Sequence, residues 1–162
     1  MDLTENLQRL LDRAAVVETV VGIANTFDRK DWPRLRSYLA DELYTDYSQF
    51  RGEPPSYVSA DAYVAARETG LRGVTSLHLT TNHEVAIDRD TATCYSAYRI
   101  YRVDSANPAR RLDTAGTYDH RLSRADSRWL VTSITQTVVV LEGDRSIHGA
   151  FRDSAGDAGR AT

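Results

Sequence analysis

The spacing of hydrophobic and polar positions changes once along the chain, from a helical period to a strand period. Residues 4–27 carry apolar side chains at intervals of three and four, which predicts a long amphipathic helix. Shorter helices are predicted over 32–40, where Asp31 can cap the first turn, and over 60–69, which Ser59 opens. The helical patterns therefore all lie in the first half of the chain.

Beyond residue 74 the apolar side chains recur at every second position, as in half-buried strands. Four long strands are predicted, joined by short polar turns, over 75–87, 91–103, 112–122 and 129–141. An earlier strand is predicted over 43–50, before the turn that contains Gly52, Pro54 and Pro55. Helices followed by long antiparallel strands predict an α+β domain, in which about three N-terminal helices cover one face of a curved sheet and enclose a pocket. The domain is expected to span 1–141, with 142–162 a largely disordered tail.

Composition and charge narrow the class of protein. A chain of 162 residues and 18.1 kDa, with 41% apolar and 27% charged residues, is typical of one globular domain. No apolar run reaches the roughly 20 residues of a spanning helix, so a membrane protein is not expected. Twenty basic and 23 acidic residues are interleaved, which argues against nucleic-acid binding. The N-terminus lacks the layout of a signal peptide, and a cytoplasmic protein is expected.

Cysteine and histidine usage gives no indication of a metal or redox site. Cys94 is the single cysteine and lies in an apolar, aromatic stretch, so we expect a buried structural thiol rather than a nucleophile. The four histidines show neither i,i+4 pairing nor an HExxH motif. No metal and no cofactor are therefore predicted.

Strand alternation and helix position single out two residues for proton transfer. Alternation places His78, Thr80 and Asn82 on one face of their strand, opposite Leu77 and Leu79. Asp28 follows the apolar stripe of the first helix, at the end where the helix dipole disfavours a carboxylate. A carboxylate that fixes a histidine tautomer makes the ring a better base near neutral pH. Spacing alone leaves open a structural histidine and a solvent-facing turn aspartate.

Aromatic and basic residues are the remaining candidates. The chain has nine tyrosines, many on predicted strands, where a phenol can polarise a carbonyl or simply pack. Arg99 and Arg102 fall on opposite faces of one strand, so one of them points inward. An aromatic-lined pocket suggests a mostly apolar, polyketide-like or phenolic compound. The residues expected to bind it are Trp32, Asn82, Tyr98, Arg102 and Tyr118.

Three stretches carry a resemblance to a known family. The segments IANTFDRKDWPRLR at 23–36, YTDYSQF at 44–50 and Ser-Leu-His at 76–78 resemble scytalone dehydratase. More broadly the chain resembles the SnoaL-like branch of the nuclear transport factor two-like superfamily, which includes hexachlorocyclohexane dehydrochlorinase and polyketide cyclases. The resemblance spans about residues 7–141 and implies a cone-shaped α+β barrel.

The resemblance also implies roles for individual residues. In the dehydratases and dehydrochlorinases an aspartate at the end of the first helix pairs with a strand histidine that acts as general base, and Asp28 and His78 stand at those positions. Tyr47 stands where a dehydratase tyrosine polarises the substrate carbonyl. Other positions depart from the pattern, since Phe27 replaces a tyrosine and Arg102 lies near the place of a second catalytic histidine. Gly116 and Tyr118 stand near the family's serine and asparagine, so we expect related chemistry on a different molecule.

The leading hypothesis is a cofactor-independent dehydratase, a lyase in which His78 and Asp28 remove a proton next to a carbonyl while Tyr47 stabilises the enolate. An isomerase or a polyketide cyclase could use the same dyad, and a non-catalytic binding module is the alternative from another class. The expected partner is a small-molecule substrate. The resemblance further implies a homo-oligomer, a trimer more than a dimer, and the apolar run 138–141 is compatible with such a contact.

Overall fold

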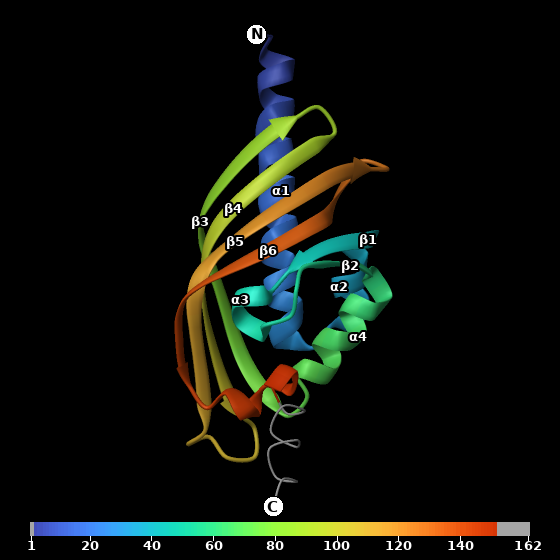
Figure 1. Cartoon of the computed structure of the whole chain (residues 1–162). Helices are drawn as coiled ribbons and strands as arrows, with labels where there is room; N and C mark the ends of the chain where they lie inside the picture. The colour runs from blue at the N-terminus through green and yellow to red at the C-terminus, as the bar shows by residue number, and fades with distance from the viewer. Residues whose placement is uncertain (1, 152–162) are drawn as a thin grey trace, which may run out of the picture.

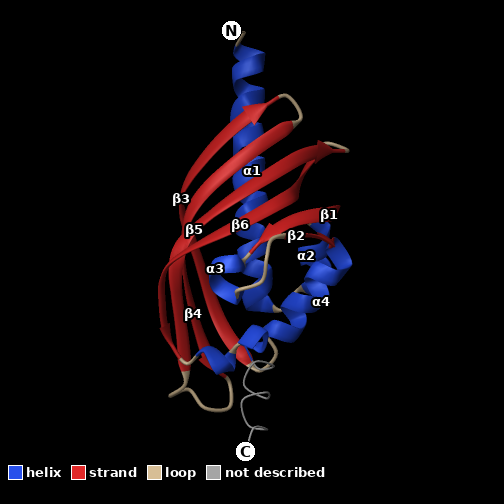
Figure 2. Cartoon of the chain, viewed as in Figure 1, coloured by secondary structure: helices blue, strands red, loops and turns tan. Residues whose placement is uncertain are grey.

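A long N-terminal helix lies along one face of a strongly curved six-stranded sheet, and shorter helices close the space between them (Figures 1 and 2). The structure is a computed structural model that describes residues 2–151. Its helices are α1 (Leu3–Arg29), α2 (Trp32–Ser37), α3 (Ser48–Arg51) and α4 (Ala60–Gly70), with 3₁₀ turns η1 (Arg145–Ile147) and η2 (Gly149–Phe151). Its strands are β1 (Leu39–Asp46), β2 (Ser56–Ser59), β3 (Val74–Asp88), β4 (Thr91–Asp104), β5 (Arg111–Ala125) and β6 (Arg128–Gly143).

The sheet confirms the α+β prediction but is mixed and does not close into a barrel. The strand order is β2-β1-β6-β5-β4-β3, so β2 and β3 are the two edges. All neighbours are antiparallel except β1 and β6, which run parallel. A parallel pair needs a long connection, and here residues 47–127, half of the chain, lie between the two strands. The expectation of a purely antiparallel sheet was therefore wrong at this one pairing.

Helix α1 packs one side against the sheet and extends past it at the N-terminal end. Asp2 and Glu5 form a capping box at its start, and Lys30 ends it in the left-handed conformation. Val16, Val20, Ile23 and Phe27 are buried in the core. The first turns project beyond the strands (Figure 1) and leave leucines exposed: Leu3, Leu7, Leu10 and Leu11. No helix within residues 2–151 has the length and apolar character needed to span a membrane.

The segment after α1 differs in detail from the sequence prediction. The helix expected over 32–40 ends at Ser37, and the strand expected over 43–50 begins at Leu39 and ends at Asp46. Asp46 Oδ1 accepts hydrogen bonds from the Ser48 amide (3.0 Å) and hydroxyl (2.7 Å), which turns the chain into α3. The four-residue edge strand β2, which pairs with β1, was not predicted because its short sequence lacks a clear alternation.

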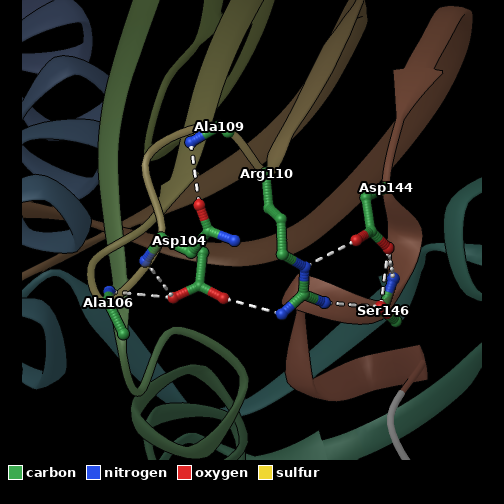
Figure 3. Close-up of polar contacts among 7 residues, drawn as sticks. Asp104, Ala106, Ala109, Arg110, Asp144 and Ser146 are labelled. Carbon is green, nitrogen blue, oxygen red and sulfur yellow. Dashed lines mark hydrogen bonds and ion pairs between the residues drawn. The ribbon is translucent and has the colours of Figure 1, made fainter.

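The chain continues as ordered structure past the expected boundary at residue 141. Strand β6 runs to Gly143, and Ile147 of η1 is buried with Phe50 and Leu112 in a small apolar cluster. Arg110, at the end of the β4–β5 loop, ties this segment down by contacting Asp104, Asp144 and Ser146, each at 2.8 Å (Figure 3). Residues 142–151 therefore close the end of the cone. The tail expected to be largely disordered over 142–162 thus has regular structure up to residue 151, and its remaining residues, 152–162, lie outside the described residues.

Cys94 is fully buried in the main core, as predicted. Burial raises the pKa of its thiol to about 11, so the thiol stays protonated at neutral pH.

Candidate active site

Asp28 and His78 meet, and the contact is built from both the ring and the backbone of the histidine. The Asp28 Oδ1 lies 2.6 Å from His78 Nδ1, and Oδ2 accepts the His78 backbone N–H at 2.7 Å. The Ser76 hydroxyl adds a third hydrogen bond to Oδ1 at 2.9 Å. Both residues sit where one end of α1 crosses β3, and their side chains are 17% and 7% exposed. A carboxylate is acceptor-only, so Nδ1 carries the proton and Nε2 is left with a free lone pair.

The protonation states suit a base. Burial works to raise the pKa of Asp28, but the hydrogen bonds from His78 and Ser76 hold that pKa below its ordinary value. Burial lowers the pKa of His78, and the nearby cations Arg102 and Lys30 lower it further against the opposing effect of Asp28. At neutral pH the aspartate is therefore ionised and the imidazole is neutral and able to accept a proton.

His78 lines an apolar and aromatic cavity between α1 and the concave face of the sheet. Its other walls include Phe27, Tyr47, Tyr63, Tyr98 and Tyr118, with Ile100 and Ile134 among the aliphatic side chains. The cavity has a volume of about 20 Å³, which is room for about one water. A ligand larger than water therefore enters only if side chains move.

Two phenols meet on the wall formed by α3 and α4. The hydroxyls of Tyr47 and Tyr63 lie 2.8 Å apart, and both side chains line the cavity. Burial raises the pKa of Tyr47 to about 12 and that of Tyr63 well above its usual value, so both stay neutral. When one phenol donates to the other, the second proton remains free for a ligand. Sequence analysis selected Tyr47 and missed Tyr63, which stands on a helix with no motif to mark it.

Tyr98 and Tyr118 also face the cavity, as expected from their strands. Their rings lie 4.5 Å apart, and Gln136 Nε2 donates to the Tyr118 hydroxyl at 3.0 Å. Gly116 belongs to this surface: a Cβ there would lie 1.9 Å from the Thr137 carbonyl oxygen and 3.1 Å from the Tyr98 hydroxyl. The chain thus cannot carry a side chain where the resemblance implied a serine.

Two expected substrate-binding residues lie elsewhere. The regular alternation that placed Asn82 beside His78 breaks at a bulge between Thr81 and Glu84, where Asn82 takes a positive φ of 56° and is exposed. Because of the bulge, the side chain of His83, and not that of Asn82, lies on the less exposed face of β3. Trp32 packs against the main core and is not among the residues that line the cavity.

Arg102 is the inward-facing arginine of β4, whereas Arg99 is exposed. It shares a face with Tyr98 and Ile100 and lies next to Ser76 in the register with β3. Its Nη1 donates to the Thr114 hydroxyl at 2.9 Å, and its guanidinium carbon lies 5.2 Å from the Phe50 ring centroid. Arg102 is not among the residues that line the cavity, and it lies against the apolar cluster of Phe50, Leu112 and Ile147.

A second buried imidazole lines the cavity on β5. His120 is 5% exposed, and burial together with the nearby His83 lowers its pKa to about 4. Its Nδ1 has no hydrogen-bond partner, so a neutral His120 offers an acceptor to the cavity. Sequence analysis did not select His120, although strand alternation from Tyr118 places it on the same face.

No group of three histidine, cysteine or acidic side chains within the described part of the chain is arranged to hold a metal ion. The polar side chains that line the cavity are two imidazoles, four phenols and the hydroxyl of Thr80, and Asp28 contacts the His78 imidazole from outside this lining.

Comparison with known proteins relates the chain to one domain family. A family model described as a SnoaL-like domain matches residues 8–149. No curated protein matches the chain. Among solved structures, the Kfla4162 protein from Kribbella flavida is 28% identical with a TM-score of 0.78, covering 83% of this chain and 95% of its own.

Two other structures share the fold at lower identity. A hexachlorocyclohexane dehydrochlorinase of type 2 is 16% identical, with a TM-score of 0.74 and coverage of 88% and 95%. A protein from Novosphingobium aromaticivorans described as a candidate scytalone dehydratase is 12% identical, with a TM-score of 0.72 and coverage of 85% and 90%.

Proposed function

The chain belongs to the SnoaL-like domain family, and on that premise we propose that it is a lyase that removes water from a small hydroxy-carbonyl compound with its own side chains as acid and base. The observation that carries the proposal is the Asp28–His78 pair at 2.6 Å, with the second ring nitrogen of His78 free at the edge of an aromatic cavity. A histidine oriented and kept neutral in this way is prepared to act as a general base.

The proposed reaction starts at the carbon next to the substrate carbonyl. His78 Nε2 takes the proton from that carbon, and the electron pair of the C–H bond forms an enolate. The Tyr47–Tyr63 pair donates a hydrogen bond to the enolate oxygen. The enolate then expels the hydroxyl of the neighbouring carbon, a carbon–carbon double bond forms, and the proton on His78 passes to the departing hydroxyl. Water leaves, and His78 returns to its neutral form beside an ionised Asp28.

Turnover of β-hydroxy carbonyl compounds, followed by mass spectrometry, tests the proposal. A dehydratase product is lighter by one water, whereas isomerisation leaves the mass unchanged. We expect Asp28→Asn and His78→Gln each to lower turnover by about 10² to 10⁴-fold, because each removes the base or its orientation. Asp31→Asn makes the same charge change three residues away, at the cap of α2, and is expected to leave turnover within a few-fold.

The lyase assignment fails if Asp28→Asn turns over a genuine substrate as fast as the native protein. It also fails if a ligand is retained without turnover and His78→Gln alters only thermal stability, which is the behaviour of a binding module.

A further inference from the structure

Arg102 is a buried cation without a carboxylate partner. It is 4% exposed, and within residues 2–151 it makes no ion pair. Among the described residues, its Nη1 donates to the neutral hydroxyl of Thr114, and its Nε has no hydrogen-bond partner. Removing a guanidinium from water without an opposite charge is unfavourable, so such groups are rarely left in this state.

A second buried cation lies beside it. Lys30 stands two residues after Asp28, in the left-handed position that ends α1, and its Nζ is buried with no hydrogen-bond partner. Asp28 accepts a hydrogen bond from the Ser76 hydroxyl, and Ser76 is paired with Arg102 across β3 and β4, so the three charges lie in one region. Burial lowers the pKa of Lys30, the charge of Asp28 raises it and that of Arg102 lowers it. The same two cations also act on His78.

The charges around the dyad do not balance. Lys30 and Arg102 contribute two positive charges, and Asp28, the carboxylate that acts on both, contributes one negative charge. Asp113 also acts on Arg102, but it forms its own ion pair with Arg111. The described residues therefore leave a surplus of one positive charge beside His78, in a place that water reaches poorly.

We propose that this site takes a substrate that carries a carboxylate, held between Arg102 and Lys30 while the reacting carbon lies against His78 Nε2. The proposal rests on the proposed function and adds an acidic group to its otherwise aromatic substrate. The cations are desolvated before any reaction begins, so they match a permanent charge on the ligand better than one that develops during turnover. A guanidinium also presents paired donors that fit the two oxygens of a carboxylate.

A pair of probes that differ in charge but not in shape tests the proposal. Binding of 2-naphthoate and of 2-naphthamide to the full chain is measured by calorimetry, together with the melting temperature of each complex. We expect the native protein to bind the acid at least about ten-fold more tightly than the amide, because charge-assisted hydrogen bonds are the stronger ones. Arg102→Gln and Lys30→Gln are each expected to reduce this ratio, with Arg102→Gln bringing it close to one.

The exposed arginine of the same strand supplies the matched control. Arg99→Gln makes the same change on the outer face and is expected to leave the ratio unchanged. Arg102→Met gives a second readout that does not depend on ligand: removing an unpaired buried charge should maintain or raise the melting temperature of the free protein while abolishing the preference for the acid. If the guanidinium instead stabilises the fold, Arg102→Met should lower the melting temperature of the free protein.

The proposal is overturned if acid and amide bind equally, if neither binds at millimolar concentration, or if Arg99→Gln changes the ratio as much as Arg102→Gln. Its failure is separable from failure of the lyase assignment. Asp28→Asn should retain the preference for the acid while losing turnover. If Asp28→Asn instead turns over a genuine substrate as fast as the native protein and still prefers the acid, the lyase assignment fails and the carboxylate site stays in place.

Discussion

Asp28 uses both of its oxygens on one short segment of β3, so the orientation of the His78 ring depends on backbone geometry as well as on the ring contact itself. An asparagine at position 28 could keep part of this geometry but would lose the negative charge that stabilises a protonated imidazole. The residue thus has a positional and an electrostatic role, and the two can be measured separately.

The titration of His78 is the first prediction at this scale. Burial and the two cations should place its pKa below 6.5, so the ring gains its proton only as the pH falls beneath the ordinary histidine range. Lys30→Gln should raise this pKa because it removes a repelling charge, and Asp28→Asn should lower it because it removes the favourable partner. Proton NMR of the ring C–H signals in the free protein measures all three values. A native pKa above 6.5 would contradict the assignment of a neutral base.

Some residues of the site could be predicted from the sequence and others could not. The position of Asp28 at the end of an apolar stripe and that of His78 on an alternating strand were enough to select the pair, because both depend on local periodicity. Asn82 was misplaced because a bulge changes the alternation and leaves no clear mark in the sequence. Tyr63 was missed because the packing of α4 brings it to the cavity. Lys30 was missed because its place at the end of a helix gives no sign that its Nζ is buried.

Elements are held to one another by a few specific contacts, and the ion pair between α1 and β5 is the clearest. Arg124 donates to both oxygens of Asp12 at 2.9 and 2.7 Å and lies over the Trp129 ring at 4.4 Å. Asp12→Asn should lower the free energy of unfolding by about 1–2 kcal/mol, between the values typical of exposed and buried pairs. Asp90→Asn, which removes the exposed second partner of Arg124, serves as the control and should change little.

The effect of Asp12 should depend on pH in a defined direction. The hydrogen bond from Arg124 holds the pKa of Asp12 below its ordinary value of 3.8. The stabilisation is therefore complete above pH 3.8 and is lost as the pH falls through the lower pKa of the folded state. Urea unfolding at pH 7 and near pH 3 should show a difference between the native protein and Asp12→Asn that shrinks in acid. A constant difference would mean that the contact acts through packing alone.

Close approach of β5 and β6 supplies a second prediction for the elements. Gly116→Ala would place a methyl group against the Thr137 carbonyl, so a strand must move and the cost should reach several kcal/mol. Gly73→Ala is the comparison, because Gly73 has a φ of 72° but open space around its Cβ, and only about 1 kcal/mol is expected. Thermal unfolding of both variants measures the difference; equal losses would show that the sheet adjusts easily at Gly116.

The order of helices and strands could be predicted from the sequence, since period and turn residues are local signals. The parallel pairing of β1 with β6 could not be predicted, because it joins strands separated by half of the chain. The ordered turns after β6 were missed for a related reason. The apolar partners of Ile147, Phe50 and Leu112, are distant in the sequence and meet it only in the folded chain.

At the scale of the whole molecule, part of the outer face of the sheet is left exposed by residues 2–151. Leu77 and Leu79 on β3 are 51% and 47% exposed, and Val139 on β6 is 75% exposed. The register sets Leu79 opposite Arg99, Arg99 opposite Ala115 and Ala115 opposite Val140, which forms one row across four strands. An outer face of this kind is compatible with the trimer implied by the family resemblance.

Sedimentation equilibrium tests the oligomer. We expect a mass that is a multiple of 18.1 kDa, with the trimer as the predicted multiple. Leu79→Glu, on the outer face, should shift the mass toward the single chain, whereas Leu10→Glu on the projecting turns of α1 should not. A native mass equal to that of one chain would exclude an obligate oligomer, and an effect confined to Leu10→Glu would move the contact to the helix.

The single, fully buried thiol can report how often the core opens under native conditions. Cys94 lies in the core between the sheet and α1, and its protonated state at neutral pH further slows attack on external reagents. A thiol reagent can modify Cys94 only in molecules whose core has opened enough to expose the thiol. The labelling rate in native buffer therefore measures how often the core opens, which an equilibrium unfolding curve does not report. The labelling rates of Asp12→Asn, Gly116→Ala and Arg102→Met would distinguish substitutions that make the core open more often from substitutions whose effect is confined to the cavity.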